Sequence, residues 1–368
     1  MEQIFMSIHA WRNSPSDFND KWLIGETTLW FSFEIVSLGG ELHYFIRLPN
    51  KYKNLLESAF YAQYPDIEIA EIKEDYIHRM PPTIDELHER GYELFGSELK
   101  LARHDAYPIR TYIDFEAIEE ERQLDPISAL LEVLAKAKPQ EHVWIQVLIK
   151  SVDDEWQKEG EKLVKQLKEK AGKREIQTPT GTFVMVERSP GELDTMKAVD
   201  RNLSKAGFET LIRYIYISPK EIYNDGFARR GIFSAFNQYA SESLNKFKQN
   251  MNVWTRIKVW QWPHVFPHRR LYARQKRVYA RFRAREMHDE TVTGMLMKWR
   301  FFDWNVRGQI KGKIVLNVEE LATIYHPPTN IVLTGPLIKR VEARKIGPPA
   351  GLAIYGGDEN DLPLPSKK

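Results

Sequence analysis

A Gly-Gly pair between two strand-like runs is the feature that most constrains the fold. Residues 31–38 read FSFEIVSL and residues 41–48 read ELHYFIRL, and both runs are rich in aromatic and β-branched side chains. Gly39 and Gly40 lie between them. Because glycine accepts the positive φ angles of a tight two-residue turn, the pattern predicts a β-hairpin. The chain is therefore expected to contain an antiparallel sheet.

The residues after this hairpin predict an α+β domain. We expect a helix over residues 49–64 that Pro65 ends, and Ile67, Ile69 and Ile72 indicate a strand. Further strands are expected at 99–103, 109–115 and 143–149, and a further helix at 125–137. We interpret residues 41–150 as strand, helix, strand, strand, helix, strand, which is the order of a ferredoxin-like split βαβ domain.

A second mixed α+β domain is expected downstream. Helices are predicted at 153–173, 190–206 and 227–247, a loop at 177–182 and an alternating strand at 208–217. The helix, strand, helix order suggests a degenerate second ferredoxin-like unit. We therefore predict a ferredoxin-like domain at 30–150, a second α+β domain at 151–316 and a connector with a frayed tail at 317–368.

Composition excludes several classes of protein. The chain has no cysteine, which excludes disulfides, thiolate nucleophiles and cysteine-based metal sites. No apolar run reaches the roughly 18 residues needed to cross a bilayer. The first residues also lack the basic and then apolar order of a signal peptide. We expect a cytoplasmic protein that reaches the inner face of a membrane only through partners.

One segment is strongly basic. Residues 243–285 contain twelve Lys or Arg and no Asp or Glu, although the whole chain has 53 basic and 51 acidic residues. Cations neutralise phosphates, and aromatic rings stack on unpaired bases. A helix is expected at 269–285. The candidate nucleic-acid-binding residues are Arg269, Arg270, Arg274, Lys276, Arg277, Arg281, Arg285, Trp260 and Trp262.

Two other interpretations of this basic segment stay open. The helix can be structural, with its arginines paired to acids elsewhere in the fold and its tryptophans in the core. It can also face anionic lipid heads.

The sequence contains no convincing catalytic constellation. The nearest match to a phosphate-binding loop, residues 308–314, has one residue too few between its glycines, and Ile314 replaces the magnesium-binding hydroxyl. We expect no cofactor and no enzymatic activity. The enzyme alternative is a metal-dependent nuclease that uses Asp66, Glu71 and Lys73. The odd spacing of the two acids would place them on opposite faces of a strand, which argues against it.

Stretches at both ends of the chain carry a family resemblance. They are residues 2–9 (EQIFMSIH), 31–37 (FSFEIVS), 61–65 (YAQYP), 317–326 (NVEELATIYH) and 338–358. They resemble an N-terminal domain family of uncharacterised bacterial proteins. In that family the domain precedes the motor domain of type IV secretion and conjugation traffic and coupling ATPases.

The resemblance implies a non-catalytic docking or assembly module that links such an ATPase to the membrane channel or presents DNA to it. The expected partner is a traffic or coupling ATPase or another secretion subunit. DNA is a further candidate partner, membrane contact is indirect, and self-association is open.

This sequence departs from the family in two ways. Family members often begin with membrane-spanning helices, which this sequence lacks, and the motor domain is missing. The segment from Asn317, a predicted helix cap with Glu320 three residues later, is therefore expected to be a connector toward an ATPase core.

Overall fold

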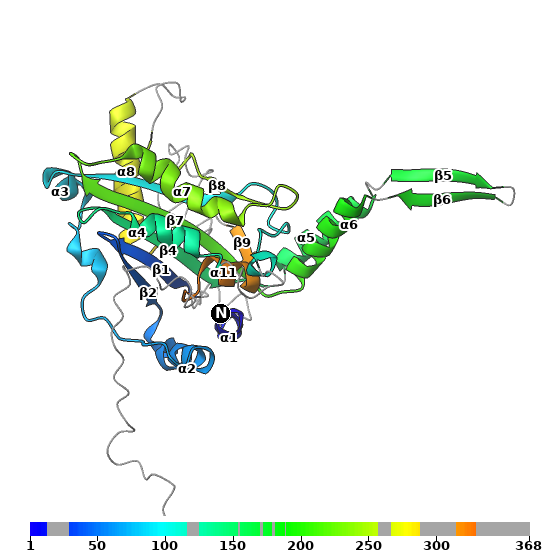
Figure 1. The fold of residues 1–368 in the computed structure, drawn as a ribbon, viewed down its shortest axis with the longest axis horizontal. Coiled ribbons are helices and arrows are strands. Elements are labelled where there is room, and N and C mark those ends of the chain that lie inside the picture. The colour runs from blue at the N-terminus through cyan, green and yellow to red at the C-terminus, as the bar shows by residue number, and fades with distance from the viewer. Residues whose placement is uncertain are drawn as a thin grey trace, which may run out of the picture. The chain divides into compact units, whose positions relative to one another are not determined.

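The computed structural model describes residues 1–12, 29–115, 125–153, 155–169, 172–178, 181–187, 189–256, 266–287 and 314–328. Within these ranges the chain is α+β, with helices on both faces of an antiparallel sheet (Figure 1). The predicted fold class is therefore confirmed. No helix of these ranges combines the length and apolar character needed to cross a membrane.

The secondary-structure elements have the following bounds. The strands are β1 (Phe31–Leu38), β2 (Glu41–Arg47), β3 (Tyr92–Leu101), β4 (His142–Ser151), β5 (Gly172–Thr178), β6 (Gly181–Glu187), β7 (Gly207–Pro219), β8 (Phe247–Gln249) and β9 (Ile314–Asn317). The helices are α1 (Glu2–Ala10), α2 (Lys53–Gln63), α3 (Ile84–Glu89), α4 (Ser128–Ala135), α5 (Glu155–Glu169), α6 (Pro190–Leu203), α7 (Ile232–Ala235), α8 (Pro267–Arg283) and α11 (Val318–Ile324). Short helical turns lie at Asn50–Tyr52, Tyr76–Arg79, Tyr112–Phe115, Phe227–Gly231 and Phe236–Tyr239.

Among the described residues, seven strands form the main sheet. Its order is β2-β1-β4-β7-β3-β8, and β9 pairs with the start of β7 beside β3. Every pair in it is antiparallel. The segments predicted as separate domains, 30–150 and 151–316, thus contribute neighbouring strands to one sheet.

The predicted hairpin is confirmed as β1 and β2. Leu38 pairs with Glu41 across the turn, and the φ angles of Gly39 and Gly40 are +64° and +92°. A side chain at Gly39 would also place its Cβ only 2.6 Å from the carbonyl oxygen of Pro139. Both the backbone angle and the close approach therefore require glycine.

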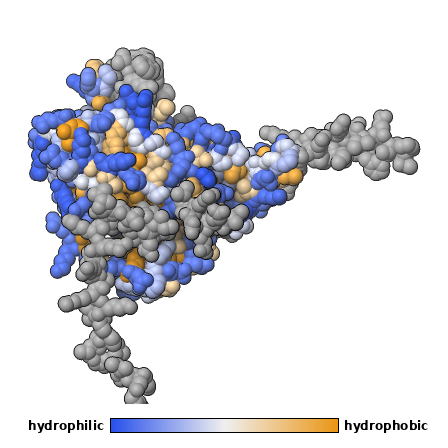
Figure 2. Space-filling view, viewed as in Figure 1, coloured by the Kyte–Doolittle hydropathy of each residue, from blue (hydrophilic) through white to orange (hydrophobic). Residues whose placement is uncertain are grey.

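Each face of the sheet has its own core. One face packs against α1, α2, α4, α7 and α11, with Phe33, Ile145 and Ile212 among its buried residues. The other face carries Trp144 and Ile215 and packs against α3 and α8. In the view of Figure 2, hydrophilic residues dominate the rim of the molecule and apolar residues show nearer its middle.

The ferredoxin-like arrangement is not confirmed. The strand predicted at 67–72 is wrong, because this stretch is irregular in the structure. Ile67 and Ile69 pack against the core and anchor this loop, while Ile72 is 52% exposed. The strand predicted at 109–115 is also wrong, since that stretch ends in a helical turn.

Two further predictions differ from the structure. The predicted long helix at 227–247 is a series of short helical turns that ends at Tyr239 and is followed by β8. The stretch predicted as a loop at 177–182 contains the end of β5 and the start of β6, which pair as an antiparallel hairpin. This hairpin joins α5 to α6, and those two helices form a small core of their own through Val164, Val199 and Leu203.

Candidate functional site

Helix α8 contains most of the candidate nucleic-acid-binding residues. The predicted helix is confirmed, and it begins at Pro267, whose fixed φ angle and missing N–H suit the first helical position. Its inner face packs on the sheet through Val278, Tyr279 and Phe282. The outer face is solvent-exposed, so the cations of the helix fall into two sets. Trp260 and Trp262 lie outside the described residues.

Arg274 belongs to the inner set. It is buried, and its Nη1 donates hydrogen bonds of 3.2 Å to the carbonyl oxygens of Trp254 and Arg256. Arg274 therefore stabilises the backbone of the segment that leads into the basic helix.

Arg285, just after α8, is also buried and forms ion pairs with two carboxylates. Its Nε and Nη2 donate to the two carboxylate oxygens of Glu34 at 2.6 and 2.9 Å, and its Nη1 donates to Asp75 at 2.6 Å. Tyr76 adds a hydrogen bond of 2.7 Å from its hydroxyl to Glu34. Burial alone would lower the pKa of Arg285, but the two carboxylates raise it well above its ordinary value. Arg285 therefore remains a cation that is held by the body of the protein.

A row of polar side chains crosses the sheet beneath this end of α8. Glu34 on β1 is opposite Gln146 on β4, Gln146 is opposite Arg213 on β7, and Arg213 is opposite Glu98 on β3. Directly opposed residues place their side chains on the same face of a sheet. All four are buried. We call these four residues the polar row.

The end of α8 is bonded to the polar row. Gln146 Nε2 donates to the carbonyl oxygen of Phe282 at 3.1 Å, and Arg213 donates to the carbonyl oxygen of Glu286. Burial lowers the pKa of Arg213 to about 10, while Glu98 acts in the opposite direction. Arg281 of α8 is buried as well and also lowers this pKa. Of the predicted site residues, Arg274 and Arg281 thus lie on the inner face of α8, and Arg285, just after the helix, is buried as well.

The outer face of α8 includes Arg269, Tyr272 and Lys276, and Phe266 precedes the helix. Phe266 is 64% exposed and Tyr272 is 38% exposed. The guanidinium of Arg269 lies 5.2 Å from the ring centre of Phe266, and the ammonium of Lys276 lies 5.8 Å from that of Tyr272. We call these four residues the outer stripe. The remaining candidates, Arg270 and Arg277, are partly buried.

The residues of the nuclease alternative lie on the surface of the protein. Asp66, Glu71 and Lys73 are all exposed in the irregular segment after α2. The carboxylate of Glu71 lies 2.6 Å from Lys53 Nζ, and this hydrogen bond lowers the pKa of Glu71. The part of the chain that the structure describes contains no group of three or more His, Asp or Glu that could hold a metal ion.

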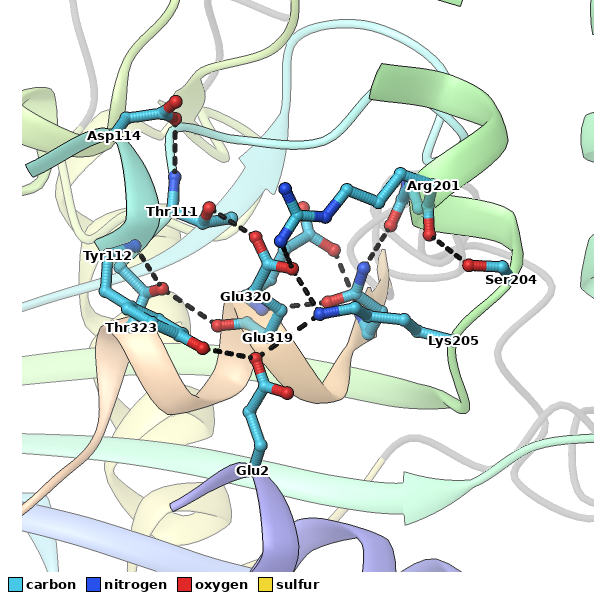
Figure 3. A network of polar contacts seen from close by, with 12 residues as sticks. Glu2, Thr111, Tyr112, Asp114, Arg201, Ser204, Lys205, Glu319, Glu320 and Thr323 are labelled. Atoms are coloured by element: carbon cyan, nitrogen blue, oxygen red, sulfur yellow. Dashed lines mark hydrogen bonds and ion pairs between the residues drawn. The ribbon is translucent and has the colours of Figure 1, made fainter. Parts of the chain in front are cut away.

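A second polar network surrounds α11 (Figure 3). The predicted capping box is confirmed, since Asn317 Oδ1 accepts from the Glu320 amide at 2.8 Å and Glu320 accepts from the Asn317 amide at 2.9 Å. Glu320 also accepts from the amide of Ile109 at 2.9 Å. Burial raises the pKa of Glu320 to about 8, although the two amides act in the opposite direction.

Glu319 joins α11 to its neighbours. Its carboxylate is bonded to Lys205, lies 3.0 Å from Arg201, and accepts from the hydroxyl of Thr111. Burial would raise the pKa of Glu319, but the hydrogen bonds from Lys205 and Thr111 lower it. Since Arg201 and Lys205 lie at the end of α6, this network fastens α11 to the α5–α6 pair.

Sequence reasoning missed the polar row. Its signal was present, because Glu34, Gln146 and Arg213 each interrupt a run of apolar strand residues. A buried charge within such a run needs a partner, so these positions indicate polar contacts across the sheet. The partner on α8 could not be identified in the same way.

Comparison with known proteins identifies a family. No curated protein and no solved structure matches the chain. The family described as "Domain of unknown function (DUF8128)" matches residues 4–334, and the chain therefore belongs to this family.

Proposed function

We propose that this chain is a non-catalytic docking and assembly module of a type IV secretion or conjugative DNA-transfer motor, and that it contacts DNA through the outer stripe of α8. The context of secretion and conjugation comes from the sequence resemblance described above. The observation that carries the DNA contact is the division of the cations of α8 between an inner and an outer face.

The inner cations are poor candidates for binding a polyanion. Arg285 is held by Glu34 and Asp75, and Arg274 donates to backbone carbonyls. Removing them from these buried partners would leave charged or polar groups unsatisfied, which costs several kcal/mol. The inner face therefore supports α8 as a fixed element.

The outer stripe has the composition of a nucleic-acid contact. Arg269 and Lys276 supply exposed cations for phosphates, and Phe266 and Tyr272 supply exposed rings for bases. Because the inner face holds the helix on the sheet, these side chains are presented from a rigid support.

The network around α11 supports the docking part of the proposal. Glu319 and Glu320 hold this helix against α6 and the segment at Ile109. A helix that is held in this way is suited to hold a neighbouring subunit in a defined orientation. The expected neighbour is a traffic or coupling ATPase.

Fluorescence anisotropy with labelled oligo(dT) and a labelled duplex tests the DNA contact. Between about 50 and 200 mM salt, the affinity is expected to fall as salt rises. The slope of log K against the logarithm of the salt concentration counts the phosphates that the protein neutralises. Replacing Arg269 and Lys276 by alanine is expected to reduce the steepness of this slope by about 0.7 for each phosphate of a single strand that is no longer neutralised. The matched control is Lys197→Ala with Arg230→Ala, which removes two exposed cations elsewhere. Salt-insensitive or absent binding would remove DNA from the proposal.

Co-expression with the traffic or coupling ATPase of the same genome tests the docking part. The two proteins are expected to co-elute in size-exclusion chromatography. Separate elution at micromolar concentrations of both proteins would contradict a docking role.

A purely structural α8 is the second candidate function. It is favoured by the inward position of Arg274, Arg281 and Arg285. Hydrogen exchange distinguishes a DNA-binding α8 from a structural one. If α8 contacts nucleic acid, adding oligo(dT) slows amide exchange at the start of the helix. If α8 is structural, adding oligo(dT) leaves the exchange unchanged.

A further inference from the structure

Asp85 is an acid that contacts the outer stripe. It lies in the first turn of α3, the helix that packs beside α8 (Figure 1). The hydroxyl of Tyr272 donates to Asp85 Oδ1, and Lys276 Nζ lies 3.6 Å from Asp85 Oδ2. The side chains of Asp85 and Lys276 are 50% and 60% exposed, so both can be reached from solvent.

The two donors that meet at Asp85 are those that a phosphate also uses. A phosphodiester oxygen accepts hydrogen bonds from Lys, Arg and Tyr side chains. A carboxylate oxygen is an anionic acceptor of the same kind. The hydrogen bond from Tyr272 lowers the pKa of Asp85, so this carboxylate is ionised at neutral pH.

The outer stripe extends well beyond Asp85. Arg269, Tyr272 and Lys276 follow at spacings of three and four, which places them on one side of α8. Arg269 is about 10 Å along the helix axis from Lys276 at 1.5 Å per residue. The guanidinium of Arg269 lies beside the ring of Phe266. A single strand that reaches both cations would therefore meet Asp85 at one end of the stripe.

We propose that Asp85 is a built-in competitor for the phosphate of a single-stranded nucleic acid: its carboxylate occupies the place beside Tyr272 and Lys276 that a backbone phosphate takes when the outer stripe is bound. This inference rests on the proposed DNA contact. Binding then exchanges one anion for another at Lys276, and the ring of Tyr272, which is exposed, stacks on a base. Asp85 weakens binding and makes it reversible.

The experiment compares variants for their affinity toward fluorescein-labelled oligo(dT). Asp85→Asn removes the charge and keeps the size of the side chain, and it is expected to tighten binding about two- to five-fold, the range that an exposed ion pair contributes. Asp85→Ser removes the carboxylate with a different side chain and is expected to give the same gain. Thermal unfolding of each variant establishes that it is folded.

The control is Glu242→Gln. Glu242 is an exposed acid whose carboxylate lies 2.6 Å from Lys246 Nζ, so this change alters the net charge equally and breaks a similar ion pair elsewhere. It is expected to leave the affinity within the error of the wild type. In the background of Lys276→Ala, Asp85→Asn is expected to give a much smaller gain in affinity. Without Lys276, Asp85 no longer competes with a phosphate for that cation.

The outcomes separate the two proposals. If the Arg269→Ala, Lys276→Ala variant loses affinity but Asp85→Asn and Asp85→Ser do not gain any, the competitor role is overturned and the DNA contact stands. If Glu242→Gln gains as much as Asp85→Asn, the effect is one of net charge, which also overturns it. If neither the wild type nor Asp85→Asn binds oligo(dT) at low salt, the DNA contact itself fails.

Discussion

Arg285, just after α8, binds Glu34, in the middle of β1, through two hydrogen bonds that join residues 251 positions apart in the sequence. Glu34 is fully buried, and Arg285 has a φ angle of +48°, a left-handed conformation that is uncommon for a residue with a side chain. The helix thus ends in a strained residue whose side chain reaches the centre of the sheet. This contact links the segment that follows α8 to β1.

Replacing Arg285 by methionine is expected to lower the free energy of unfolding by about 3–5 kcal/mol, because it leaves the buried charge of Glu34 without its main partner. Urea denaturation measures this loss. Combining it with Glu34→Gln is expected to cost less than the sum of the two single changes. A loss below about 1 kcal/mol, as for a surface ion pair, would show that the contact is not maintained in solution.

Replacing Arg274 by alanine is expected to destabilise the protein by about 1–3 kcal/mol, since buried carbonyl oxygens lose their donor. Arg269→Ala, on the outer face of the same helix, is expected to change stability by less than about 0.5 kcal/mol. Thermal unfolding of the two variants side by side gives the comparison. Equal effects would contradict the division of α8 into inner and outer faces.

Replacing Gly96 by alanine is expected to push α8 away from the sheet. The new Cβ would lie 2.6 Å from Val278 Cγ1 on α8 and 3.2 Å from Ile215 Cγ2. Overpacking of this kind costs about 1–3 kcal/mol in the free energy of unfolding. Val278→Ala makes room for the added methyl group, so in that background Gly96→Ala is expected to cost less. If Gly96→Ala lowers the free energy of unfolding equally in the wild type and in Val278→Ala, the added methyl group does not collide with Val278.

Glu320 is expected to make stability depend on pH. Its pKa is raised to about 8 by burial, so between the pKa of the unfolded chain, about 4.5, and about pH 8 the folded state binds more protons than the unfolded state. The contribution of this group to stability therefore falls as pH rises through that window, by at most about 1.4 kcal/mol per pH unit.

Urea denaturation from pH 5 to pH 8 tests this, with Glu320→Gln as the comparison. The free energy of unfolding of the wild type minus that of Glu320→Gln is expected to decrease with rising pH. A difference that is constant or increases with pH would show that Glu320 is ionised in the folded protein throughout the range.

Local signals in the sequence predicted much of the secondary structure. Gly39 and Gly40 indicated the first hairpin, and Asn317 with Glu320 indicated the start of α11. The apolar runs at 143–149 and 208–217 also became the central strands β4 and β7. Each of these signals involves only a few neighbouring residues, so propensity and capping rules can detect it.

The sheet order and the polar row depend on contacts that the sequence does not reveal. Ile67 and Ile69 have the spacing of a strand, yet they find no neighbouring strand and pack individually against the core. The basic helix was predicted as such, but the partners of its buried cations lie far away in the sequence or on the backbone: Arg285 pairs with Glu34 and Asp75, and Arg274 donates to the carbonyl oxygens of Trp254 and Arg256. Tertiary packing overrides local pattern at these positions.

Ultraviolet cross-linking of the protein to oligo(dT), followed by mass spectrometry of the cross-linked peptides, tests most directly whether the outer stripe contacts nucleic acid. Exposed aromatic rings that stack on bases lie close enough to react, so cross-links are expected at Tyr272 or Phe266 and are expected to weaken with rising salt. They are expected to increase in Asp85→Asn. Cross-links confined to other segments, or none at low salt, would contradict the assignment of α8 as the nucleic-acid contact.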